Sequence, residues 1–73
     1  MQEKLKELGY IDASQDGVIG YYKTYKGFRL FVGCNIGVDR WFACLTIGRI
    51  EIMIPGVVND EWLVGFDKEN EGW

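Results

Sequence analysis

The sequence predicts a small α+β domain, with a short N-terminal helix followed by an antiparallel β-meander of four to five strands. Two patterns carry this prediction. Leucines at helical spacing open the chain, and later runs alternate apolar and polar residues between turn signals. With 73 residues, 48% of them hydrophobic, the chain is expected to form one domain, 1–73, around one core.

A helix is predicted over residues 2–8, because Leu5 and Leu8 lie at helical spacing and Gly9 can cap the C-terminus. So short a helix is stable only when its leucines pack against another element. The residues that follow are polar and favour turns, so we expect a connector into the first strand. Its turn-forming residues are Asp12, Ser14, Asp16 and Gly17.

The first two strands are predicted on either side of a turn at Lys26-Gly27. The first runs from Val18 and is rich in aromatic and β-branched residues. Alternation in the second strand, 28–36, sends every second side chain to the same face of the sheet. The side chains on that face are Phe28, Leu30, Val32, Cys34 and Ile36.

The register of the next two hairpins is predicted from apolar pairing, since a slip by one residue would send every core side chain to the wrong face. Centring the second hairpin in its loop pairs Ile36 with Trp41. A two-residue turn at Gly48-Arg49 then pairs Ile47 with Ile50. The predicted core is Leu30, Val32, Ile36, Trp41, Leu45, Ile47, Ile50, Ile52 and Ile54.

After Pro55-Gly56 breaks the fourth strand, residues 57–66 are expected to form one more short strand. A helical turn started by Asn59 or Asp60 is the alternative. Residues 67–73 are predicted as an acidic C-terminal end, with flexibility as one option. The acidic side chains of this part are Asp60, Glu61, Asp67, Glu69 and Glu71.

The opposite face of the predicted sheet is mixed in character. Tyr22, Phe31 and Phe42 lie on it, together with Cys44, Met53 and several polar residues. An antiparallel sheet usually buries one face and exposes the other to water. Aromatic residues on both faces therefore require either a helix or a partner molecule over the second face.

The sequence lacks the residues that ordinary catalysis uses. It contains no histidine, which is the usual general base of serine and cysteine nucleophiles and the commonest metal ligand. Ser14 is the one serine, and it has no partner base. Cys34 and Cys44 fit neither a zinc site nor a paired redox motif, and a cross-strand disulfide would require a register shift of one residue. We expect no enzyme, no cofactor and no metal.

Charge and hydropathy limit the partners and the location. The formal net charge is −3 and no basic cluster exists, which disfavours nucleic-acid binding. No apolar run has the length of a secretory signal or a membrane span. We therefore expect a cytosolic protein without a membrane contact.

The leading hypothesis is a non-catalytic protein-binding module, of the kind that phages use to inhibit a host enzyme or a defence complex. It would act sterically or by acidic mimicry of phosphate charge, on a partner that the sequence does not identify. The expected contact residues are Asp60, Glu61, Trp62, Asp67, Glu69, Glu71, Trp73, Tyr22, Phe31 and Phe42. One alternative is a homodimeric structural or accessory protein that pairs through the mixed face. The other is an aromatic platform for a small molecule or nucleic acid.

Overall fold

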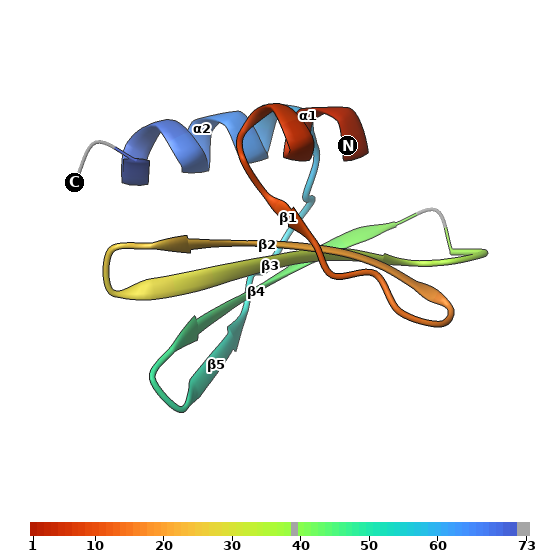
Figure 1. Ribbon diagram of the computed structural model, residues 1–73, viewed down its shortest axis with the longest axis horizontal. Coiled ribbons are helices and arrows are strands. Elements are labelled where there is room, and N and C mark those ends of the chain that lie inside the picture. Colours follow the sequence, from red (N-terminus) through yellow and green to blue (C-terminus); the bar gives the residue numbers. More distant parts are fainter. Residues whose placement is uncertain (39, 72–73) are drawn as a thin grey trace.

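The computed structural model describes residues 1–38 and 40–71 as one antiparallel sheet with a helix at each end of the chain. The strands follow one another across the sheet in sequence order (Figure 1), which confirms the predicted α+β meander. The elements are α1 (Gln2–Glu7), β1 (Ile11–Asp12), β2 (Val18–Tyr25), β3 (Phe28–Asn35), β4 (Trp41–Ile47), β5 (Ile50–Met53) and α2 (Asp60–Glu71).

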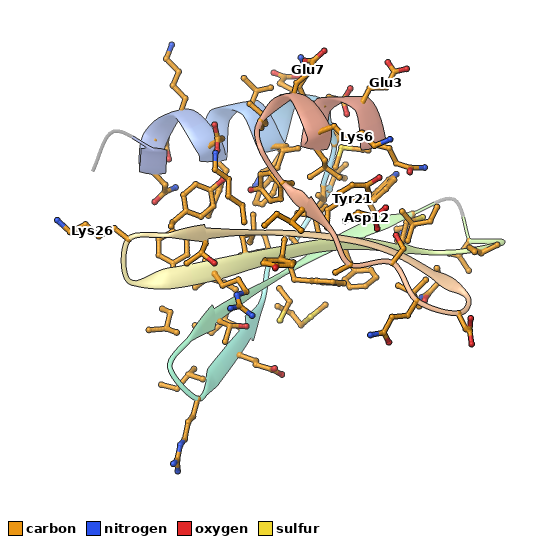
Figure 2. The ribbon with its side chains drawn as sticks, in the orientation of Figure 1. Glu3, Lys6, Glu7, Asp12, Tyr21 and Lys26 are labelled. Carbon is orange, nitrogen blue, oxygen red and sulfur yellow. The ribbon has the colours of Figure 1, made fainter. Side chains whose placement is uncertain are left out.

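Both helices lie on the same side of the sheet (Figure 1), so the molecule has two layers. Leu5 of α1 and Leu63 of α2 are fully buried there. Tyr21 points from β2 toward α1 (Figure 2), where its hydroxyl donates to Gln2 Oε1 at 3.1 Å. The core cluster is Leu5, Tyr10, Tyr21, Tyr25, Leu30, Val32, Ala43, Val58 and Leu63.

The end of α1 confirms the predicted glycine cap. Gly9 has a φ of 88°, a left-handed conformation that glycine adopts without steric cost. The Tyr10 amide donates to Leu5 O at 2.9 Å, and the Gly9 amide donates to Lys6 O at 3.2 Å. These two bonds form a Schellman motif, which satisfies carbonyls at the helix end and turns the chain toward the sheet.

The expected connector contains the first strand. Ile11 and Asp12 pair with Tyr22 and Tyr21, so β1 is a fifth strand at the edge next to β2. The polar residues after it do form a turn, because Asp12 Oδ1 accepts from the Ser14 amide at 2.8 Å. The turn was predicted, but the two-residue strand before it was not.

Two of the three predicted hairpins are confirmed and one is shifted. Tyr25 pairs with Phe28 and Ile47 with Ile50, as expected. Trp41 pairs with Cys34 instead of Ile36, because the loop between β3 and β4 is longer than the sequence suggested. Ile36 does not pair with β4, and its amide donates to Gly17 O at 2.9 Å. A shift of two residues keeps every side chain on its predicted face.

The predicted core is correct within β3 but wrong on the β4–β5 hairpin and at Ile36, which follows the end of β3. Leu30 and Val32 are buried, and Trp41, Leu45 and Ile54 are half-buried. The exposed members of the predicted core are Ile36, Ile47, Ile50 and Ile52. For Ile47, Ile50 and Ile52 the physical reason is visible in Figure 1, where the β4–β5 hairpin extends away from both helices. The helix layer is too small to cover it.

The expected strand over 57–66 is wrong, since Asp60–Glu71 forms the helix α2. The alternative reading named the right start, because Asn59 Oδ1 accepts from the Trp62 amide at 2.9 Å and caps the helix. Asp60 and Glu61 in the first turn also favour the helix N-terminus electrostatically. Packing of Leu63 on the sheet selects the helix.

Candidate functional site

The structure divides the predicted contact residues among separate places. Glu61, Trp62 and Glu69 lie together on the outer side of α2, where they line a shallow hollow. Asp60 is exposed at the start of α2, and its Oδ1 lies 3.2 Å from the amino group of Met1. The Glu71 side chain and Trp73 lie outside the residues whose placement is described.

The hollow on α2 has a volume of about 530 Å³ and combines an apolar floor with an acidic edge. Glu61, Gly65 and Glu69 are spaced four residues apart, which places them in one row along the helix. Gly65 has no side chain, so the row is open at its centre. The full lining is Val57, Asn59, Glu61, Trp62, Gly65, Phe66 and Glu69.

Trp62 and Phe66 form the floor of this hollow, and ring contacts connect them to the core. The rings of Trp62 and Phe66 stack with their centroids 5.2 Å apart. Phe66 in turn makes edge-to-face contacts with Tyr25 at 5.5 Å and Phe28 at 6.0 Å, which connects the floor to the sheet. Val57, 78% exposed, adds an apolar side chain at the edge. A rigid aromatic floor of this kind loses little entropy when a partner binds.

The sequence prediction included Trp62 and the two glutamates but missed Val57 and Phe66. The sequence feature that could have identified Phe66 is its spacing of four residues from Trp62, because residues at this spacing are neighbours on a helix and lie far apart on a strand. Because a strand was expected there, the two rings were not brought together.

The face of the sheet opposite the helices carries the predicted aromatic residues Tyr22, Phe31 and Phe42, all half-buried. No helix in the described part of the chain covers this face (Figure 1). The rings cover it instead: a Cβ on Gly33 would lie 2.9 Å from both Phe31 and Phe42. Aromatic rings thus fill the space that a side chain would occupy at this glycine.

A cation also covers part of this face. The Arg29 guanidinium lies 5.0 Å from the centre of the Tyr22 ring, a cation–π distance. Phe31 and Phe42 pack close to glycine and Tyr22 lies beneath a cation, so these rings offer less surface for stacking on a base or ligand. The geometry therefore favours the aromatic platform less than the hollow on α2.

Asp67, expected on an acidic surface, is 3% exposed and lies between α2 and the sheet. Its Oδ1 accepts from Lys23 Nζ at 2.8 Å and from the Tyr25 hydroxyl at 2.7 Å. Lys23 also donates to Leu8 O at 2.7 Å, and the hydroxyls of Tyr25 and Tyr10 are 2.6 Å apart. We call Tyr10, Lys23, Tyr25 and Asp67 the buried polar cluster. It joins α2 and the segment that follows α1 to β2, so Asp67 has an internal role.

The buried polar cluster predicts a loss of stability at alkaline pH. Burial, and then the hydrogen bonds to Tyr10 and Asp67, raise the pKa of Tyr25 well above the usual value of about 10. The folded state therefore holds this proton more tightly than the unfolded state. The resulting stability is present below about pH 10 and falls above it, by about 1.4 kcal/mol per pH unit.

Urea unfolding at a series of alkaline pH values measures this effect. Tyr25→Phe is expected to flatten the fall in the free energy of unfolding, because the titrating hydroxyl is removed. Tyr22→Phe, on the opposite face of the sheet, serves as the control and should keep the wild-type slope. Equal slopes in wild type and Tyr25→Phe would contradict the assignment to Tyr25.

Comparisons with protein-family models, with curated proteins and with solved structures find no match to this chain. Within residues 1–38 and 40–71, no helix has the length and apolar character that crossing a membrane requires. In the same part of the chain, no group of three or more His, Cys, Asp and Glu residues could hold a metal ion. Cys34 and Cys44 are free thiols.

Proposed function

We propose that this domain is a non-catalytic protein-binding module that takes a basic and apolar segment of a partner protein in the hollow on α2. One observation carries the proposal: the stacked Trp62 and Phe66 rings form the apolar floor of a hollow edged by two glutamates. Buried aromatic anchors supply most of the affinity at protein interfaces. Charges at the edge select the partner and accelerate association.

The dimensions of the hollow define the segment that fits. Glu61 and Glu69 are eight residues apart on a helix, which corresponds to about 12 Å along its axis. An extended peptide covers that distance in about four residues. The matching segment therefore has Lys or Arg at both ends of a short run, with apolar side chains between them over the aromatic floor.

The same charge suits the phage-type role, in which the domain would cover a basic surface of a host enzyme or defence complex. A net charge of −3 supports attraction toward such a surface. This role is the biological setting that we propose for the module, and it depends on the hollow being the contact site.

Selection from a random peptide library tests the proposal. Enriched peptides are expected to carry basic residues on both sides of an apolar residue. Glu61→Lys combined with Glu69→Lys should weaken their binding by at least about tenfold, since two ion pairs are lost and replaced by repulsion. Added salt should weaken wild-type binding as well.

Glu3→Lys combined with Glu7→Lys is the matched control. It reverses the same number of charges at exposed positions of α1, where both side chains project away from the sheet (Figure 2). Val57→Asp tests the apolar part at a residue that contributes little to the core. Unchanged binding by both the Glu61/Glu69 variant and Val57→Asp would refute the site, and an absence of basic peptides would refute its charge preference.

A further inference from the structure

Strand β5 has more exposed apolar residues than β1, the strand at the other edge of the sheet. It lies at the edge of the sheet, and all four of its residues are exposed. Three of them are apolar: Ile50 is 61% exposed, Ile52 46% and Met53 61%. The β4–β5 hairpin also projects away from the helix layer (Figure 1), so neither described helix covers these side chains.

The outer edge of β5 presents backbone groups that can pair with another strand. In an antiparallel ladder, alternate residues direct their N–H and C=O groups toward the same neighbour. The Ile54 amide donates to Ala43 O at 3.0 Å, so Ile52 and Ile50 share that direction toward β4. Glu51 and Met53 therefore direct their backbone groups outward, where no described strand pairs with them.

Soluble proteins usually protect such an edge with lysines, prolines, bulges or very short strands. The opposite edge of this sheet follows the rule, since β1 has two residues and one of them is Asp12. Strand β5 instead places isoleucine and methionine around its open edge. Its single charged residue is Glu51.

We propose that β5 pairs antiparallel with β5 of a second copy of this chain, across a two-fold axis centred on Ile52. The two sheets then continue into each other. In this register each Glu51 exchanges backbone hydrogen bonds with Met53 of the other copy. Ile52 lies opposite its own counterpart and Ile50 lies opposite Ile54, which creates an apolar stripe across the interface.

The sequence of β5 selects this register over its two neighbours. Centring the axis on Glu51 would place two carboxylates directly opposite each other, which is destabilising. Centring it on Met53 would pair Glu51 with Pro55, which has no N–H to donate. Only the register centred on Ile52 uses the outward groups of both Glu51 and Met53 without either conflict.

A second copy is the occupant that this edge fits, because the strand is complementary to itself in that register. The benefit is also large for a small domain. A chain of this length buries only about 60% of its unfolded surface when it folds, so pairing that removes isoleucines from water adds useful stability. The interface is separate from the hollow on α2, so either proposal can fail without the other.

Sedimentation equilibrium over a range of concentrations tests the interface, with the wild type expected as a dimer. Ile52→Lys places two ammonium groups together at the axis and is expected to raise the dimer dissociation constant by about a hundredfold. Val64→Lys, at a 39% exposed position of α2, is the matched control and should leave the dimer intact. Circular dichroism confirms that each variant is folded.

Met53→Pro is a second, independent variant. It removes an N–H that points outward, so the pairing of β5 with β4 is retained while the pairing between copies is lost. A monomeric wild type at high concentration would overturn the proposal. A dimer that persists in both the Ile52→Lys and the Met53→Pro variants would also overturn it. If Phe42→Lys were the only one of these substitutions to dissociate the dimer, the interface would lie on the opposite face of the sheet and the proposal would be wrong.

Cysteine cross-linking tests the register itself. In a Cys44→Ser background, Ile52→Cys is expected to form a disulfide between copies when treated with oxidised glutathione, because the two residues face each other at the axis. Glu51→Cys should not cross-link in the proposed register. Efficient cross-linking by Glu51→Cys and none by Ile52→Cys would show that the register is wrong.

Discussion

Replacing Lys23 by methionine is expected to lower the free energy of unfolding by about 3–5 kcal/mol. Asp67 is almost fully buried, and Lys23 provides a positive charge 2.8 Å from its Oδ1. Without that cation, a carboxylate remains in a poorly solvated site. For a 73-residue domain the total stability is only about 4–11 kcal/mol. We therefore expect a large shift of the urea midpoint, measured by tryptophan fluorescence.

Two variants separate the loss of charge from the loss of a side chain. Lys26→Met is the control, because Lys26 projects into solvent from the β2–β3 turn (Figure 2), and it should change stability by less than about 0.5 kcal/mol. Lys23→Met combined with Asp67→Leu should recover much of the loss, since no buried charge remains. If Lys23→Met costs less than about 1 kcal/mol, the pair does not have the role we assign to it.

Leu63→Ala is expected to destabilise the domain by about 2–5 kcal/mol. Leu63 is fully buried and is the residue by which α2 packs most completely into the core. Its truncation removes apolar contact and leaves a cavity between the helix and the sheet. Because isolated helices of this length are marginal in water, α2 depends on that packing. Thermal unfolding followed by circular dichroism measures the effect.

The neighbouring residue is the matched control for Leu63. Val64 is 39% exposed on the outer side of the same helix, so Val64→Ala removes little buried area. Alanine also has a higher helix propensity than valine, so the free energy of unfolding should stay constant or rise slightly. Equal losses from Leu63→Ala and Val64→Ala would contradict the packing described for α2.

Helix α2 connects the core with the candidate site. Its inner side carries Leu63 and Asp67, which hold it on the sheet, and its outer side carries the hollow. Phe66 belongs to both, because it stacks on Trp62 and contacts Tyr25. A dimer formed through β5 would present two such hollows, so a target with two basic segments would gain avidity from simultaneous contact.

The candidate site was only partly predictable from sequence. Glu61, Trp62 and Glu69 were expected as contacts and do lie in one hollow. Asp67 was expected among them, yet the helical period turns it inward toward Lys23. Whether a carboxylate of α2 is exposed or buried depends on which side of the helix its residue faces. A strand prediction alternates the two sides with a different period, so it cannot assign that side.

The sequence by itself determined the local geometry of this protein. Gly9 ends the first helix, and the turns at Lys26-Gly27 and Gly48-Arg49 fix two hairpins. Alternation assigns each strand residue to a face, and this assignment held even where the β3–β4 register shifted by two. These features depend on a few neighbouring residues, so turn chemistry and periodicity are sufficient to predict them.

Only the tertiary structure decided which apolar residues are covered. The alternation that places Val32 in the core also places Ile52 on the same face, but the helices extend over one and not the other. Residues 57–66 could favour either strand or helix locally, and packing of Leu63 against the sheet made the choice. Burial depends on where distant segments meet, because the free energy of covering an apolar side chain comes from its partner across the core.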